Sequence, residues 1–214
     1  MQQLRIAARG SRLSRIQVEE VMRRLPGVRY EMIYTDTYGD RHHELSLLNG
    51  EAPDDIFTRE LDAALISGRA DVAIHSAKDL PAVIDRRIEV IALYEAFDKT
   101  DSLVSRGGLR LSELPPGSTV GTSSPLRKEG ILRLRPDLRV VSIRGCIEER
   151  VAQVDGGSID SVIVATCALK RLGMENRIAE VLPFATHPMQ GRLAVTALKR
   201  REDLRQIFSQ GSLI

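Results

Sequence analysis

The chain has 214 residues, of which 43% are hydrophobic, so it can bury a core as one large domain or as two small ones. Its 31 basic and 29 acidic residues leave a net charge of +2, and aromatic residues make up only 4%, which argues against a nucleic-acid-binding protein. No apolar stretch reaches the length of a membrane-spanning helix, and the N-terminus lacks a signal-peptide pattern, so we expect a cytoplasmic protein that does not enter membranes.

In the first half of the chain, predicted strands alternate with predicted helices. Four segments show the apolar runs or the two-residue alternation of strands: Leu4–Ala8, Val28–Thr35, Ala70–Ile74 and Ile88–Tyr94. One helix is predicted after the first strand and should end before Pro26. A second helix carries Phe57 and Leu61 on its apolar face, and Gly68 is placed to end it.

The same alternation resumes after a charged, glycine-bearing connection at Asp98–Gly108. Three further strands are predicted: Ser118–Gly121, Arg139–Ile143 and Ile159–Ala165. A helix is predicted after each of them, the first with Ser124 as its N-cap, the second from about Ile147 and the third through Arg171. Strands that alternate with helices imply an α/β fold with mostly parallel sheets.

Several strand-to-helix junctions carry small polar residues or arginine: Arg9-Gly10-Ser11, Gly121-Thr122-Ser123-Ser124 and Arg144-Gly145-Cys146. In open α/β sheets, ligands bind at the carboxyl ends of the strands, where helix N-termini favour anions. Arginine adds bidentate contacts to carboxylates, so the pattern predicts a polycarboxylate site, although phosphate, sulfate or an amino acid would fit as well. The basic residues between Arg127 and Arg150 belong either to such a surface or to a solvated helix face.

The most distinctive segment is Asp71-Val-Ala-Ile-His-Ser-Ala-Lys-Asp-Leu-Pro81, in which Lys78 and Asp79 follow a buried strand. A lone Lys-Asp pair at a strand end would be interpreted as a surface ion pair. The whole segment, however, resembles the HSxKDxP signature of the porphobilinogen deaminases, also called hydroxymethylbilane synthases.

Further motifs of that family follow in the same order along nearly the whole chain. They are Arg5-Ile-Ala-Ala-Arg-Gly-Ser11 (RIATRxS), Thr37-Tyr-Gly-Asp40 (TxGD), Phe57-Thr-Arg-Glu-Leu61 (LFxKEL), Gly121-Thr-Ser-Ser124 with Arg135-Pro-Asp-Leu138 (GTSSxRR and RPDL), Arg144-Gly-Cys-Ile-Glu-Glu-Arg150 (RGNxxTR), Leu169-Lys-Arg-Leu-Gly173 (LKRLG) and Gln190-Gly-Arg-Leu-Ala-Val195 (QGALAV). The variants found here resemble most the short, chlamydial type of the family.

The resemblance implies two periplasmic-binding-protein-like (type II) α/β domains that flank a cleft. Domain 1 would be discontinuous, with residues 1–94 and 186–214, and domain 2 would span residues 95–185. In the family, a third α+β domain carries the cysteine that anchors the cofactor. This domain is expected to be absent, because the chain ends soon after the segment that starts at Gln190.

The resemblance also implies a transferase of heme biosynthesis, which condenses four porphobilinogen molecules head to tail and releases ammonia each time. The product would grow on a dipyrromethane cofactor. The partner would be the small molecule porphobilinogen, with no nucleic acid and no membrane, and we expect a monomer. Porphobilinogen carries carboxylates, and loss of ammonia leaves a cationic azafulvene. The site therefore needs cations for the carboxylates and one carboxylate at the reacting nitrogen.

By resemblance, Asp79 is the catalytic carboxylate, which stabilises the developing positive charge and shuttles protons. The residues expected to bind substrate or cofactor are Arg9, Ser11, Phe57, Lys78, Thr122, Ser123, Ser124, Arg127, Arg144, Gly145, Arg150, Arg171 and Gln190. Two of these have a structural alternative, since Ser124 could be only an N-cap and Arg171 could cap a helix C-terminus. His75 is expected to be a structural hydrogen-bonding residue.

The chain departs from the family pattern within the matched region as well. The segment Asn49–Asp55 is acidic where the family has a loop rich in glycine and lysine, and its carboxylates would repel a carboxylate-rich product. Leu126 stands where the family has the first arginine of SSxRR, so one carboxylate contact is expected to be lost. Cys146 replaces an asparagine.

Cys146 raises a hypothesis of its own. It precedes a helix and lies between Arg144 and Arg150, features that lower the pKa of a thiol and favour the thiolate. It could anchor the pyrrole chain covalently; otherwise dipyrromethane would be held non-covalently, and Cys146 would be a half-buried residue chosen for its small size. Its spacing to Cys167 fits neither a zinc motif nor a redox pair, and no metal site is expected.

Three functions are compared on these grounds. The leading one is the enzyme, and the alternative is a non-catalytic protein derived from it that binds a pyrrole or another carboxylate. Asp79 favours the enzyme, because binding of an anion does not need a carboxylate, whereas the expected absence of the third domain favours the binding protein. A generic solute-binding protein is disfavoured by the missing signal peptide and by the specific motifs.

Overall fold

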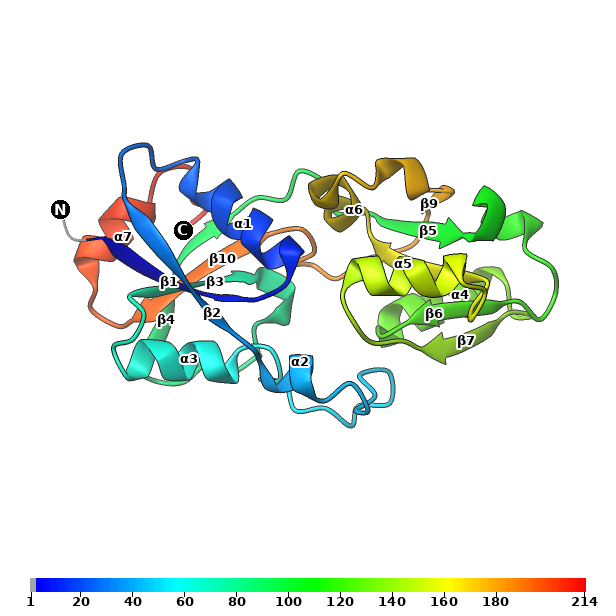
Figure 1. Cartoon of the computed structure of the whole chain (residues 1–214), viewed down its shortest axis with the longest axis horizontal. Helices are drawn as coiled ribbons and strands as arrows, with labels where there is room; N and C mark the ends of the chain where they lie inside the picture. The colour runs from blue at the N-terminus through cyan, green and yellow to red at the C-terminus, as the bar shows by residue number, and fades with distance from the viewer. Residues whose placement is uncertain (1–2) are drawn as a thin grey trace. The chain divides into compact units, whose positions relative to one another are not determined.

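The computed structural model of the protein describes residues 3–214. By its internal contacts the chain divides into two compact units. Unit 1 comprises Met1–His42, Pro53–Ala96 and Gly191–Ile214, and unit 2 comprises His43–Ala52 and Phe97–Gln190. Each unit is built on a five-stranded sheet with helices packed against it, so the expected α/β fold is confirmed (Figure 1).

The sheet of unit 1 has the strand order β2-β1-β3-β10-β4. Its strands are β1 (Leu4–Arg9), β2 (Tyr30–Thr35), β3 (Val72–Ser76), β4 (Ile88–Tyr94) and β10 (Leu193–Leu198). Strand β1 pairs in parallel with β2 and β3, whereas β10 runs antiparallel to β3 and β4. The carboxyl ends of β1, β2 and β3 therefore share one edge of the sheet with the start of β10.

Helices cover both faces of this sheet. Helices α1 (Arg12–Met22) and α7 (Glu202–Phe208) share one core, and α3 (Arg59–Ile66) forms another core on the opposite face. The alternation of side chains along β1 sends Ile6 into the first core and Ala7 into the second. A short helix, α2 (Tyr38–Arg41), follows β2.

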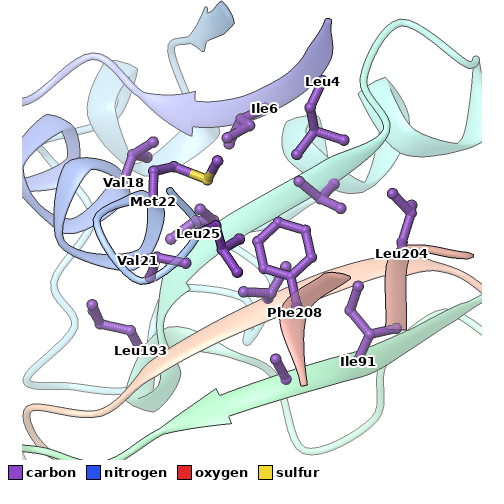
Figure 2. Packing of buried hydrophobic residues seen from close by; sticks show 14 of the residues in the cluster. Leu4, Ile6, Val18, Val21, Met22, Leu25, Ile91, Leu193, Leu204 and Phe208 are labelled. Carbon is purple, nitrogen blue, oxygen red and sulfur yellow. The ribbon is translucent and has the colours of Figure 1, made fainter. Parts of the chain in front are cut away.

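The first core of unit 1 is centred on an aromatic ring. Figure 2 shows the ring of Phe208 among aliphatic side chains from α1 and the turn after it, the sheet and α7, including Leu25, Ile91 and Leu204. Phe208 is fully buried, and its carbonyl oxygen accepts a hydrogen bond of 2.8 Å from the Tyr94 hydroxyl. The last helix of the chain is thereby attached to the edge strand β4.

The sheet of unit 2 has the strand order β7-β6-β8-β5-β9. Its strands are β5 (Asp101–Ser105), β6 (Thr119–Thr122), β7 (Arg139–Ser142), β8 (Ser161–Ala165) and β9 (Glu180–Leu182). Strand β6 is parallel to β7 and β8, whereas β5 is antiparallel to β8 and β9. The start of β5 therefore lies beside the carboxyl end of β8, with Asp101 opposite Ala165.

Two cores enclose this second sheet. Helix α4 (Pro125–Leu134) contributes Ile131 to one of them, and α5 (Ile147–Asp155) and α6 (Thr166–Leu172) form the other. Every residue of β8 is buried, which is typical of a central strand covered on both faces. Ile163 of this strand enters the first core, and Val162 enters the second.

Two expectations about the sheets are wrong. The connection predicted at Asp98–Gly108 contains the buried strand β5, and the sheets are mixed because β5 and β10 run antiparallel to their neighbours. Serines interrupt the apolar pattern of β5, which hides the strand in the sequence. Their hydroxyls are bonded inside unit 2, Ser102 to the Thr166 hydroxyl at 2.6 Å and Ser105 to the Leu109 carbonyl at 2.5 Å.

The seven predicted strands are confirmed, with ends that shift by at most two residues. Strand β4 has the predicted bounds, Ile88–Tyr94, and β3 ends two residues later than predicted, at Ser76. The extension of β3 follows from pairing, since Ser76 lies opposite Leu193 of the antiparallel strand β10. The periodicity of a single segment cannot predict this extension, because it carries no information about the strand that pairs with it.

Replacement of Phe208 by alanine should lower the free energy of unfolding by about 3–5 kcal/mol, because the buried ring is lost and a cavity remains. Ile207 lies on the same helix but is 37% exposed, so Ile207→Ala is the matched control and should cost less than about 1 kcal/mol. Urea unfolding followed by circular dichroism measures both values. Equal losses in the two variants would contradict the core shown in Figure 2.

Candidate functional site

In unit 1, the predicted site residues follow the carboxyl ends of parallel strands. Arg9 is the last residue of β1, and Lys78 and Asp79 lie in a short 3₁₀ turn directly after β3. The segment after β2 leads through Thr37 into α2. Because these strands end at a common edge of the sheet, the three segments can meet there.

Arg9 stands between two carboxylates of unit 1. Its Nε and Nη2 donate hydrogen bonds to the two carboxylate oxygens of Asp40, with Nε 3.1 Å from Oδ2. Its Nη1 lies 4.0 Å from Oδ2 of Asp79. The guanidinium also lies over the ring of Phe57, 4.4 Å from the ring centre. The structure thus brings together Arg9, Phe57 and Asp79, which were predicted, and Asp40, which was not.

Asp40 is held from its other side by Thr37. Its Oδ2 accepts hydrogen bonds from the backbone N of Thr37 at 3.1 Å and from the Thr37 hydroxyl at 2.7 Å. Partial burial by itself raises the pKa of Asp40, but the hydrogen bonds from Arg9 and Thr37 outweigh it and hold the pKa below its ordinary value. Asp40 is therefore an anion at neutral pH.

The turn that carries Asp79 is fixed by two hydrogen bonds. Gln17 of α1 is buried, and its Nε2 donates to the hydroxyl of Ser76 at 2.8 Å. The backbone N of Ala77 donates to the carbonyl of Arg192 at 3.0 Å, just before β10 begins. Asp79 itself keeps 26% of its side-chain surface exposed. It is therefore a solvent-accessible carboxylate on a well-anchored backbone.

Ser11, also predicted to contact a ligand, is the N-cap residue of α1. Its hydroxyl oxygen accepts a hydrogen bond of 3.2 Å from the backbone N of Ser14. The side chain is partly exposed. A hydroxyl that accepts one bond can still donate its proton, so capping and ligand contact are compatible at this residue.

His75 is a buried neighbour of Arg9 within β3. Its exposed fraction is 5%, and its Nε2 lies 3.0 Å from the hydroxyl oxygen of Thr196 in β10. Burial, together with the positive charge of Arg9, lowers the pKa of the ring to about 4. A neutral, hydrogen-bonded ring agrees with the structural role expected for His75.

In unit 2, the three predicted hydroxyl residues organise the turn between β6 and α4. The Thr122 hydroxyl is fully buried and accepts a hydrogen bond of 3.2 Å from the backbone N of Ser124. The Ser123 hydroxyl donates to the carbonyl of Ile143, and the Ser124 hydroxyl caps α4 by accepting from the backbone N of Arg127 at 3.4 Å. Ser123 and Ser124 stay partly exposed, whereas Thr122 is closed off from solvent.

Arg127 forms a buried ion pair with Asp101. Its Nε and Nη2 donate to Oδ2 and Oδ1 of Asp101 at 2.9 and 2.6 Å, and its Nη1 donates to the carbonyl of Ile163 at 3.2 Å. Gln190 is also buried and donates from Nε2 to Oδ1 of Asp101 at 2.6 Å. Arg127 was expected to bind a carboxylate of a ligand, but the carboxylate that it binds is that of Asp101, inside the protein. Neither Arg127 nor Gln190 faces solvent.

Four predicted residues surround the start of α5. Gly145 has a φ of +98°, and a Cβ at this position would lie 2.4 Å from Oε2 of Glu149, so the backbone here requires glycine. The Nε of Arg150 donates to the carbonyl of Gly145 at 2.9 Å. Cys146 is the N-cap residue of α5 and follows Arg144, which is partly buried.

The expectation of a lowered pKa for the Cys146 thiol is wrong. Partial burial raises the pKa above its ordinary value, and the negative charges of Glu149 and Glu148 raise it further. Both glutamates lie in the first turn of α5. Their charges and the burial outweigh what the helix N-terminus contributes to a thiolate.

Arg171 lies in the last turn of α6, and its guanidinium is 5.1 Å from the ring centre of Phe97. A cation in this position interacts favourably with the carboxyl end of the helix dipole. The contact with Phe97 and the place in the helix suit the structural alternative for Arg171, and its partial exposure leaves the predicted ligand contact open.

In the acidic segment Asn49–Asp55, two carboxylates have hydrogen-bond partners close by in the chain. Asp55 pairs with Arg59 through hydrogen bonds of 2.7 and 2.9 Å. Glu51 accepts from the backbone N of Ser46 at 3.1 Å and from the side-chain amide of Asn49 at 3.3 Å. The carboxylates of Glu51 and Asp55 are thus engaged locally, which weakens the repulsion expected from this segment.

Three residues at these sites were not predicted: Gln17, Asp40 and Asp101. Asp40 had a usable signal, since an acidic residue three positions after Thr37 fits a capping box at the start of a helix. Gln17 and Asp101 had none, because their partners lie 59 and 26 residues away along the chain.

Among residues 3–214, no helix is long and apolar enough to cross a membrane. Over the same part of the chain, no group of three or more His, Cys, Asp or Glu side chains is arranged to hold a metal ion.

Comparison with known proteins finds relatives for almost the whole chain. A family model described as "Porphobilinogen deaminase, dipyromethane cofactor binding domain" matches residues 4–206. A porphobilinogen deaminase from Caldicellulosiruptor saccharolyticus is 38% identical over 205 residues, which cover 93% of this chain and 70% of that protein. A probable porphobilinogen deaminase from Methanopyrus kandleri is 38% identical over 215 residues, which cover 96% of this chain and 71% of that protein.

Among solved structures, a periplasmic substrate-binding protein of an ABC transporter from Coxiella burnetii is similar in fold. Its TM-score is 0.58 at 14% identity, and the match covers 97% of this chain and 91% of that chain. At this identity the likeness concerns the fold alone. It confirms the expected periplasmic-binding-protein-like architecture.

The substitution Asp101→Asn should lower the free energy of unfolding by about 3 kcal/mol, because it leaves the buried Arg127 charge without its counter-ion. Glu129→Gln is the matched control, since it breaks an exposed pair with Arg133 on α4 and should cost less than about 1 kcal/mol. Urea unfolding compares the two variants. A loss for Asp101→Asn no larger than that of the control would indicate that Arg127 is free for a ligand.

The stability of the protein should depend on pH through His75. Its pKa is about 4 in the folded protein, against 6.5 in an unfolded chain, so the unfolded chain binds the proton first as the pH falls. The stabilisation is complete above about pH 6.5, and up to about 3 kcal/mol of it is lost by about pH 4. The variant His75→Gln keeps a hydrogen-bonding group that does not titrate. Unfolding curves with the same pH dependence in both proteins would rule out a neutral ring.

Proposed function

The chain belongs to the porphobilinogen deaminase family, and we propose that it is a transferase that joins porphobilinogen units head to tail and releases ammonia for each bond formed. The observation that carries this proposal is the environment of Asp79. This carboxylate is partly exposed, stands on a turn anchored by Gln17 and Arg192, and faces the Arg9 guanidinium at 4.0 Å. A fixed, accessible carboxylate suits a reaction in which positive charge develops at a nitrogen.

We propose that Asp79 acts at the aminomethyl group of porphobilinogen. The amine reacts in its protonated, ammonium form: the bond between carbon and nitrogen breaks, ammonia leaves with the electron pair, and a cationic azafulvene remains. A pyrrole carbon then attacks the exocyclic carbon and afterwards loses its proton. Asp79 stabilises the positive charge between these two events and accepts or passes on the proton. Because Gln17 and Arg192 fix the backbone of its turn, the carboxylate needs little reorganisation during the reaction.

The carboxylates of the substrate need donors, and each unit offers a set. In unit 1, Lys78 adjoins Asp79 on the same turn, and the Ser11 hydroxyl stands at the start of α1. We assign both to substrate carboxylates, because an ammonium, a hydroxyl and helix backbone N–H groups all bind anions. Phe57 is assigned a contact through its partly exposed ring, which also supports Arg9.

In unit 2, the donors gather at the starts of two helices. Ser123 and Ser124 precede α4, and Arg144 and Arg150 flank the first turn of α5. Each of these four residues is partly exposed, and we assign them to carboxylates of the bound pyrroles. Thr122, Arg127, Gly145 and Gln190 are buried or committed to internal contacts, so they are assigned to shaping these junctions.

The donor set of unit 2 fits dipyrromethane, the cofactor that the family model names. Dipyrromethane carries acidic side chains on both pyrrole rings, and hydroxyl and guanidinium groups are the partners that carboxylates prefer. When bound, it supplies the free pyrrole carbon to which the first porphobilinogen is joined. The raised pKa of the Cys146 thiol disfavours a covalent anchor at that residue, so we propose non-covalent contacts for this region.

The variant Asp79→Asn should lower kcat for the formation of uroporphyrin from porphobilinogen by about 100-fold or more, because an amide cannot balance the developing positive charge. Asp85→Asn is the matched control: Asp85 is 31% exposed at its side chain and paired with Arg87 in the same unit, and its loss should leave kcat unchanged.

The absorbance of uroporphyrin, the oxidised product, measures the rate of turnover of both variants. Turnover that survives Asp79→Asn would overturn the mechanism. Tight binding of porphobilinogen without any turnover by the unchanged chain would overturn the catalytic proposal itself.

A further inference from the structure

The guanidinium of Arg9, at the end of β1, has the carboxylates of Asp40 and Asp79 near it, and its contacts with the two differ. Asp40 takes Nε and Nη2 of Arg9 in a bidentate pair. Asp79 faces only Nη1, and the 4.0 Å to its Oδ2 is beyond hydrogen-bond distance. The side chains of Asp40 and Asp79 are 28% and 26% exposed, so access to solvent does not explain the difference.

The difference lies in how Asp40 is fixed. Its Oδ2 accepts from the backbone N and from the hydroxyl of Thr37, which is itself fully buried and cannot follow a movement of the carboxylate. Asp40 therefore presents both oxygens to Arg9 in one orientation. A bidentate pair between a guanidinium and an oriented carboxylate is stronger and more directional than a single contact.

An aromatic ring holds the guanidinium from a second direction. Arg9 lies over the ring of Phe57, and that ring packs directly on the backbone of Gly39, where a Cβ would come within 2.4 Å of it. The backbone N of Gly39 donates to the carbonyl of Ile56 at 2.9 Å, which ties α2 to the segment before Phe57. Arg9 would lose both the ion pair and the ring contact if it swung toward Asp79.

We propose that Asp40 is a positioning residue of the reaction, which retains Arg9 in a bidentate pair so that the oxygens of Asp79 stay available to the reacting nitrogen. The proposal rests on the function proposed above for Asp79. A closed pair between Arg9 and Asp79 would occupy that carboxylate with charge-assisted hydrogen bonds and oppose its action on a cation. With Nη1 of Arg9 4.0 Å from Oδ2 of Asp79, Arg9 lies near this carboxylate without a hydrogen bond to it.

The charge states of Asp40 and His75 support the pairing of Arg9 with Asp40. Burial raises the pKa of Asp40, but its hydrogen bonds to Arg9 and Thr37 lower it by more, so the ion pair persists well below neutral pH. The buried ring of His75, also near Arg9, has a pKa of about 4 and adds no positive charge that could draw Asp40 away.

Kinetics test the proposal with three variants. Asp40→Asn keeps the shape but loses the charge, so Arg9 is released toward Asp79; kcat should fall by about tenfold or more, while KM for porphobilinogen changes by less than about threefold. Asp40→Glu keeps the carboxylate and should recover part of kcat. Asp36→Asn removes an exposed carboxylate just before α2 and should change neither constant. A rise in KM at constant kcat for Asp40→Asn would overturn the proposal.

A spectroscopic readout does not depend on turnover. The Nε–H signal of Arg9 in a ¹⁵N NMR spectrum, identified by its loss in Arg9→Lys, reports the partner of that nitrogen. In the unchanged protein it should not respond to Asp79→Asn, because Nε is bonded to Asp40. In the Asp40→Asn protein the same substitution should shift it.

Equal responses in both backgrounds, or none in either, would overturn the inference. Since the signal is present whether or not the protein turns over substrate, such a result is distinct from a failure of the proposed function. Circular dichroism of each variant establishes that it is folded before the signals are compared.

Discussion

Both units depend on the constraint that parallel strands end at a common sheet edge. In unit 1, this geometry brings Arg9 at the end of β1 close to Asp79 after β3, although the two residues are far apart in the chain. In unit 2, it brings Ser123 after β6 to Ile143 after β7. The antiparallel strands β10 and β5 begin at these same edges.

The starts of those two antiparallel strands complete each arrangement. Arg192, just before β10, accepts the hydrogen bond that fixes the turn of Asp79, and Asp101, the first residue of β5, pairs with Arg127. At this edge of a mixed sheet, polar groups therefore come both from the ends of the parallel strands and from the starts of the antiparallel strands. A purely parallel sheet would have left Arg127 without an internal counter-ion at this place.

The two arginines show how burial decides the role of a residue type. Arg9 is the last residue of β1, Arg127 lies in the first turn of α4 after β6, and both were expected to bind carboxylates of a ligand. Arg127 is 8% exposed, and a charge removed from water needs a full set of partners, which Asp101, Ile163 and Gln190 supply. Arg9 keeps a partly exposed side chain and one nitrogen directed at Asp79.

Much of this arrangement could be predicted before the fold was known. The apolar runs predicted most strands to within two residues, and the segment from Asp71 to Pro81 identified both the family and the turn of Asp79. Strand β5 was missed because two serines break its apolar pattern, and the partner of the buried Ser102 hydroxyl, Thr166, lies 64 residues away along the chain. The pKa of Cys146 was predicted with the wrong sign because burial, its largest cause, depends on the fold, although Glu148 and Glu149 stand two and three residues after it in the sequence.

The sequence by itself determined the α/β class, the family, and the presence of a Lys-Asp turn after a buried strand. These depend on periodicity and on contiguous motifs, which a linear chain already contains. Only the tertiary structure decided which partner each charged group takes: Asp40 for Arg9, and Asp101 for Arg127. The physical reason is that a guanidinium pairs with whichever carboxylate the folded backbone fixes within hydrogen-bond distance, and both carboxylates come from other segments of the chain.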